Sequence, residues 1–160
     1  MKRETLFLKM AVLLIGSPVL ALCLFGVPRI ASSDTSILGP ELSFWRIPLI
    51  IGLYLTAFAF FVALYQAIKL LGLIDKNEAF SELSVRALTV IMTCAVIISI
   101  FYVAVLPLLY AVAEIEDAPG IIVIGLVILF ASTVIAVFAA VLKKLFKHAI
   151  EIKSENDLTV

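Results

Sequence analysis

Four long uncharged stretches divide the chain, and short segments containing charged residues, glycine or proline separate them. The stretches are Met10–Pro28, Ile47–Ile68, Ala87–Ala113 and Ala118–Leu142. Each is close to the roughly 20 apolar residues that an α-helix needs to cross about 30 Å of hydrocarbon. The pattern predicts an all-α fold of four membrane-spanning helices in a single domain, residues 1–160. We expect the helices at about 6–28, 47–70, 81–113 and 118–152, followed by a loose tail over 153–160.

Composition supports an integral membrane protein, because 64% of the 160 residues are hydrophobic and only 15% are charged. Soluble domains have far more charge. Lys2 and Arg3 precede the first stretch as they would precede a signal peptide, but its uncharged core exceeds the usual length of about 7–15 residues. We therefore expect a retained helix, with cleavage as the lesser alternative. No long hydrophilic segment is present to form a soluble catalytic domain.

The formal net charge of zero conceals a strong asymmetry between the connecting segments. Short loops rich in Lys and Arg tend to stay on the cytoplasmic side of a membrane. Two cationic residues, Arg29 and Arg46, fall on one side of the predicted helices. The other ten fall on the opposite side: Lys2, Arg3, Lys9, Lys69, Lys76, Arg86, Lys143, Lys144, Lys147 and Lys153. This count predicts two antiparallel transmembrane hairpins in the bacterial cytoplasmic (inner) membrane, with both termini cytoplasmic.

Small side chains recur at helical spacing on one face of the second helix and one face of the fourth. In lipid, such residues let helix backbones approach closely. We interpret both stripes as packing faces of a four-helix bundle, and a substrate path along them is the alternative. The candidate packing residues are Gly52, Thr56, Ala59, Ala63, Gly125, Ser132, Ala136 and Ala140.

Polar side chains are few within the apolar stretches. Gln66 is about level with Thr89, which predicts a hydrogen bond between the second and third helices. The hydroxyl groups of the third helix are also expected to bond to their own backbone carbonyls. Pro18 removes one helical hydrogen bond and predicts a kink in the first helix.

Residue types that carry chemistry are sparse. His148 is the single histidine, and Cys23 and Cys94 lie at different expected depths. No nucleophile motif, phosphate loop or nucleic-acid-binding module is present in the sequence. We therefore expect no catalytic, cofactor or metal site, and no direct binding of nucleic acid.

The connection between the second and third helices holds the remaining candidate site. Ser81 is predicted to cap the third helix, and Phe80 to pack against Val85. Asp75 with Glu78 offers another possible helix start. The loop is a candidate surface for docking a partner, although it could serve only to reverse the chain. The candidate docking residues are Lys76, Glu78, Phe80, Ser81 and Glu82.

Two segments, NEAFSELSVRAL (Asn77–Leu88) and IKSENDLTV (Ile152–Val160), resemble those of the YoaS-like family of small bacterial four-helix membrane proteins, a domain of unknown function. In that family a Phe-Ser pair opens the third helix, as Phe80 and Ser81 do here, and Asp157–Val160 match its end. The likeness spans essentially the whole chain. It implies no established activity, but a frequent pairing with a small helix-turn-helix regulator encoded alongside.

Two classes of function remain open. The first is a non-enzymatic membrane protein that senses, signals or confers tolerance to membrane-active agents, with the lipid bilayer and a cytoplasmic helix-turn-helix regulator as partners. The second is a small transporter or permease component. Either could form a homo-oligomer.

Overall fold

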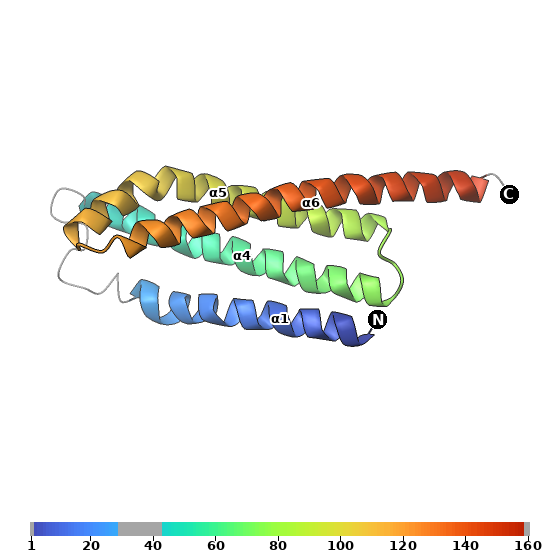
Figure 1. Ribbon diagram of the computed structural model, residues 1–160, viewed down its shortest axis with the longest axis horizontal. Helices are drawn as coiled ribbons and strands as arrows, with labels where there is room; N and C mark the ends of the chain where they lie inside the picture. The colour runs from blue at the N-terminus through green and yellow to red at the C-terminus, as the bar shows by residue number, and fades with distance from the viewer. Residues whose placement is uncertain (1, 29–42, 159–160) are drawn as a thin grey trace.

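The computed structural model describes residues 2–28 and 43–158, and the elements it contains are helical. Four of the helices are long and apolar enough to cross a membrane, which confirms the predicted all-α class and number of spans (Figure 1). The elements are α1 (Lys2–Ala21), the π-helical turn η1 (Leu22–Gly26), the 3₁₀ turn η2 (Ser43–Trp45), α4 (Arg46–Asp75), α5 (Glu82–Ile115) and α6 (Gly120–Leu158).

The first helix is irregular beyond its proline. Pro18 lies inside α1, and the π-helical turn η1 begins four residues later. In that turn the Val27 amide donates to the Leu22 carbonyl, one residue further back than in an α-helix. The kink at Pro18 stays a prediction, because the irregular turn that the structure shows begins beyond it, at Leu22.

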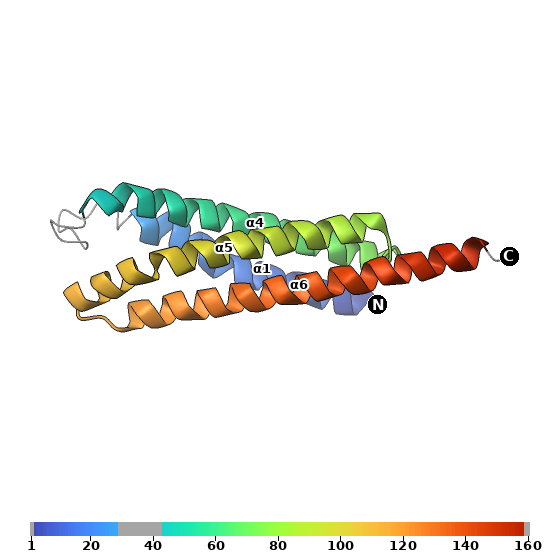
Figure 2. The same ribbon diagram turned by 90° about the horizontal axis from the view of Figure 1, so that it is seen from above.

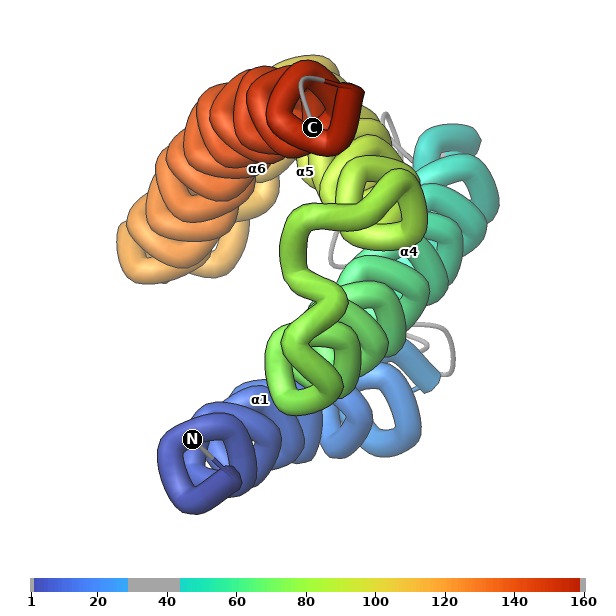
Figure 3. Tube along the Cα trace, turned by 90° about the vertical axis from the view of Figure 1, so that its right-hand side faces the viewer, coloured from blue at the N-terminus to red at the C-terminus, as the bar shows by residue number. Residues whose placement is uncertain are grey.

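Each helix runs antiparallel to its neighbour in the chain. Thr5 and Asp75 meet at one end of α1 and α4, whereas the Cys23 carbonyl and the Tyr54 hydroxyl are 3.5 Å apart near the other. The main interhelical contacts join α1 to α4, α4 to α5, and α5 to α6. Viewed along the helices, they form an arc with α1 and α6 at its two ends (Figure 3). The predicted bundle is thus an open one.

The closest packing joins α5 to α6, which lie side by side along much of their length (Figures 1 and 2). Buried residues on α6 recur every seven positions, at Gly125, Ser132 and Ala139. A seven-residue repeat is typical of left-handed coiled-coil packing. Ala139 is 3% exposed, whereas Ala140, which was predicted in this stripe, is half buried. The predicted set followed a spacing of four beyond Ser132 and so missed Ala139.

Glycine makes the closest approaches between helices. A Cβ atom on Gly125 would lie 2.6 Å from Leu109 Cδ1, and one on Gly52 would overlap the Phe101 ring. Gly52, Thr56 and Ala59, all predicted as packing residues, are buried on α4.

The interface between α4 and α5 centres on a small apolar cluster. Ala59 packs there with Cys94 and Ile98, and Ala63 lies partly buried against them. Together with the small residues on α4, this cluster holds α4 close to α5.

Hydroxyl groups link the middle of α5 to the first half of α6. The Ser99 and Ser132 hydroxyl oxygens are 2.8 Å apart, and the Thr133 hydroxyl is 3.4 Å from that of Ser99. Each hydroxyl oxygen also lies 2.8–3.0 Å from a carbonyl oxygen of its own helix, so its single proton always has an acceptor within the protein.

Helix α6 extends well past the other helices at its C-terminal end (Figure 1). It continues to Leu158, so the loose tail predicted from residue 153 is wrong for residues 153–158. Residues 143–158 contain neither Gly nor Pro and are rich in Lys and Glu, which favour helix.

We predict that Gly52→Ala destabilises the protein by about 1–3 kcal/mol, because the new methyl group forces the Phe101 ring to move. Thermal unfolding in one detergent measures the effect. Gly72→Ala is the matched control, since a Cβ atom there meets nothing within 4 Å and alanine favours helix by up to about 1 kcal/mol. A Gly52 variant that melts like the parent would contradict close packing between α4 and α5.

Candidate functional site at the basic end

Cationic residues gather where α1 begins, α4 ends and α5 begins, and along the second half of α6. We call this region the basic end; the first and last described residues lie on this side of the molecule (Figure 1). Its cations are Lys2, Arg3, Lys9, Lys69, Lys76, Arg86, Lys143, Lys144, Lys147 and Lys153. It also contains a polar contact between two helices and an ordered connecting loop.

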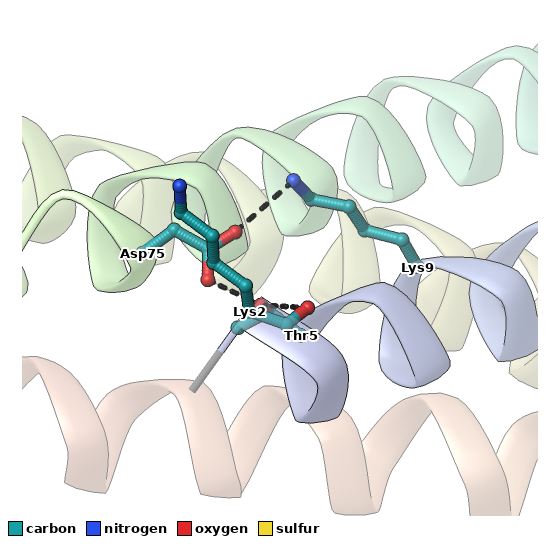
Figure 4. A network of polar contacts seen from close by, with 4 residues as sticks. All are labelled: Lys2, Thr5, Lys9 and Asp75. Carbon is teal, nitrogen blue, oxygen red and sulfur yellow. Dashed lines mark hydrogen bonds and ion pairs between the residues drawn. The ribbon is translucent and has the colours of Figure 1, made fainter.

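A carboxylate clasp joins α1 to α4 at this end (Figure 4). The Asp75 carboxylate accepts a hydrogen bond from the Thr5 hydroxyl and lies 3.4 Å from the Lys9 ammonium nitrogen. The Thr5 hydroxyl is also 3.2 Å from the Lys2 carbonyl. Thr5 is only 4% exposed. The clasp is therefore a specific contact at the interface between the two helices.

The position of Asp75 explains why its carboxylate needs partners. Asp75 is the last residue of α4, where the partial negative charge of the helix terminus disfavours a carboxylate. Its partners come from the first turns of α1, whose N-terminal partial charge is positive. Asp75 was considered from the sequence only as a possible helix start. The sequence did contain a signal for this contact: Asp75 is an acidic residue shortly after a predicted helix, in a region that is otherwise rich in Lys and Arg.

The loop after Asp75 is ordered by hydrogen bonds to backbone groups. Ser81 is the N-cap of α5, as predicted, and its hydroxyl accepts from the Ser84 amide at 3.4 Å. The Ser81 hydroxyl also donates to the Glu78 carbonyl at 2.8 Å. Ser84 is fully buried, and its hydroxyl lies 3.3 Å from the same carbonyl. The loop thus has a defined conformation over residues 78–84.

Phe80 connects this loop to α6. Its ring centroid is 5.3 Å from that of Phe146, and the two rings meet edge to face at 76°. The predicted staple placed Phe80 against Val85, but the ring contact found is with α6. Phe146 is seven residues beyond Ala139, so the contact extends the α5–α6 seam into the loop.

The five candidate docking residues therefore divide into two groups. Lys76 and Glu78 are exposed on the loop, and Glu82 is exposed at the start of α5. Ser81 and Phe80 stabilise the loop through the cap and the aromatic contact, although Phe80 remains 53% exposed. The arrangement presents exposed charges on an ordered support.

The predicted Gln66–Thr89 hydrogen bond is absent from the part of the chain that the structure describes. The Thr89 hydroxyl donates to the Val85 carbonyl at 2.8 Å. A threonine in a helix reaches the carbonyl four residues earlier without any approach of a second helix, so the local bond prevails. Gln66 is half buried on α4.

No group of three or more His, Cys, Asp or Glu side chains suited to a metal ion occurs within residues 2–28 and 43–158. Both cysteines are free thiols. What the basic end offers is a charged, ordered surface.

Comparison with known proteins assigns this architecture to a family. The model of a family described as "Protein of unknown function (DUF2975)" matches residues 30–160. The chain belongs to the DUF2975 family. It is also 62% identical over 159 residues to the "Uncharacterized membrane protein YoaS" of Bacillus subtilis (strain 168), with 99% of each chain covered. The resemblance found in the sequence is confirmed.

The two comparisons differ in extent. The family model begins after α1, whereas the alignment with YoaS takes in nearly the whole of that helix. Neither description names an enzymatic activity, and no solved structure matches the chain.

We predict that Asp75→Asn lowers the melting temperature in detergent by a few degrees, because the amide cannot provide the charge that faces Lys9. Glu78→Gln, which removes an exposed carboxylate three residues away, is the matched control and should melt like the parent. Combining Asp75→Asn with Lys9→Gln should cost less than the sum of the single effects. Additive losses would contradict a direct interaction.

Proposed function

We propose that the protein is a non-enzymatic component of the bacterial cytoplasmic membrane that senses or signals through its basic end, or confers tolerance to membrane-active agents. Its helices would form two transmembrane hairpins with both termini and the 76–81 loop in the cytoplasm. The observation that carries the proposal is the ordered loop, whose cap and Phe80–Phe146 contact hold exposed charges at a junction of α4, α5 and α6.

The interior of the helices supports a role without transport. The four apolar stretches contain no Asp, Glu, Lys, Arg or His, the residues that usually mark ion and proton pathways in membranes. The central hydroxyls of Ser99 and Ser132 bond to each other and to their own helices. Polar structure capable of recognition is instead concentrated at the basic end.

A cytoplasmic partner suits this location. The family resemblance implies pairing with a small helix-turn-helix regulator, and we propose such a protein as the partner of the 76–81 loop and the adjoining Glu82. The regulator would bind the nucleic acid, while this chain would supply a membrane-bound docking surface. A homo-oligomer could present several such loops together.

A small transporter or permease component is the second candidate function. The open arc of helices favours it, because α1 and α6 occupy opposite ends and leave no closed bundle (Figure 3). A path would then require a second copy to complete its wall. Uptake of a solute by vesicles containing only this protein would establish transport.

The topology is tested with a reporter that is active only outside the cytoplasm. Fusions after Ser33 or Asp117 should be active, whereas fusions after Asn77 or Val160 should be inactive, because ten of the twelve cationic residues then lie inside. Immunoblotting shows that all four fusions are present at equal levels. Activity of the Asn77 fusion would overturn the two-hairpin arrangement.

Docking at the loop is tested by crosslinking and capture from native membranes. Lys76→Glu and Glu78→Lys should each abolish capture of a cytoplasmic partner without changing the melting temperature, since both side chains are exposed. Lys153→Glu, which reverses an exposed charge on the projecting part of α6, is the matched control and should leave capture intact. Capture that survives both loop reversals would exclude this loop as the docking surface.

A further inference from the structure

A groove of about 380 Å³ lies between α1 and α4. Its walls run from Val12 to Leu20 on α1 and from Phe61 to Ile68 on α4, and they are apolar except for the hydroxyls of Ser17 and Tyr65. The groove falls within the membrane-spanning part of both helices. Gly16 forms part of its floor, where a Cβ atom would lie 3.0 Å from Leu64.

Helical periodicity places a lysine beyond each wall of this groove, toward the basic end. Lys9 precedes Val12 by three residues and Gly16 by seven, so it shares their face of α1. Lys69 follows Tyr65 by four and Phe61 by eight on α4. An apolar channel therefore leads to two ammonium groups at the membrane boundary.

We propose that this groove binds one acyl chain of an anionic phospholipid, with the lipid phosphate held between Lys9 and Lys69. Apolar grooves with a few polar groups are the usual form of a small-molecule site. Lysine side chains near a membrane boundary extend their ammonium groups to the headgroup layer, where they attract anionic lipids.

The length of the groove identifies a lipid chain as the occupant. Val12 to Leu20 covers about 12 Å of helix at 1.5 Å per residue. One leaflet contributes about half of the roughly 30 Å hydrocarbon thickness. The groove therefore matches a chain that enters from the basic end and stays within one leaflet. A transmembrane helix from a second copy would require a contact surface across both leaflets.

The surrounding charges favour a phosphate. Lys69 is exposed, and Lys9 is 32% exposed while it also faces Asp75 at 3.4 Å. Lys2 lies on the same face of α1 as Lys9 and beside the Asp75 carboxylate (Figure 4). Lys2 and Lys9 thus lie near the one carboxylate, and Lys69, six residues before Asp75 on α4, adds a third cation at this end of the groove.

Native mass spectrometry of the delipidated full chain in detergent tests the site, with phosphatidylglycerol and phosphatidylcholine of identical acyl chains as probes. The parent should retain one phosphatidylglycerol in preference to phosphatidylcholine. Lys69→Gln should weaken phosphatidylglycerol binding about fivefold, as expected for one lysine near a membrane surface. Lys144→Gln, which removes an exposed lysine of α6, should have no effect.

A second pair of variants tests the groove itself. Ser17→Leu adds bulk to the lining and should reduce retention of both lipids, whereas Ala21→Leu adds the same bulk to an exposed position of α1 outside the lining. Melting temperatures equal to that of the parent show that each variant is folded. If Ser17→Leu has a lower melting temperature than the parent, Leu13→Phe replaces it, because it narrows the same groove with an apolar side chain.

Three results would overturn the proposal. Equal retention of phosphatidylglycerol and phosphatidylcholine would show that the lysines do not select the headgroup. Equal losses of phosphatidylglycerol binding in Lys69→Gln and Lys144→Gln would show that any lysine near the membrane surface has the same effect. A parent dimer that Ser17→Leu converts to a monomer would assign the groove to a second copy of the chain.

Discussion

In lipid, helices associate without the hydrophobic driving force that assembles soluble proteins. Apolar side chains gain little by leaving lipid for another helix, so close packing and hydrogen bonds decide which helices stay together. The interface between α5 and α6 has both, in the seam of Gly125, Ser132 and Ala139 and in the Ser99–Ser132 pair. The other contacts can be ranked by the same criterion.

By the measure of close packing and interhelical hydrogen bonds, α1 is held less tightly than the other helices. Its buried residues are Thr5 and Gly16, and a groove lies between it and α4. Packing is therefore incomplete along the middle of this interface, and the clasp of Thr5, Lys9 and Asp75 supplies a specific interaction at its end. The family model also begins after α1. The part of the chain that the family model matches thus contains the better-packed helices α4, α5 and α6.

Local features of this fold could be predicted from the sequence, whereas features that depend on a second helix could not. The four spans follow from hydrophobic length, and the Ser81 cap follows from the residues next to it. The seam residue Ala139 could not be told from its neighbour Ala140 by residue type, and only the packing of α6 against α5 shows which of the two is buried.

The basic end shows the same division. The Asp75 clasp joins residues about 70 positions apart, and the Phe80–Phe146 contact joins the loop before α5 to α6. Nothing in the sequence pattern specifies which of many charged or aromatic residues will meet across such separations. Both contacts lie where the apolar stretches end. The uneven distribution of Lys and Arg therefore indicated the basic end from the sequence, but not which residues contact each other there. The faces exposed along the candidate spans are apolar, whereas the charged contact between α1 and α4 and the ring contact between the loop and α6 both lie at the basic end.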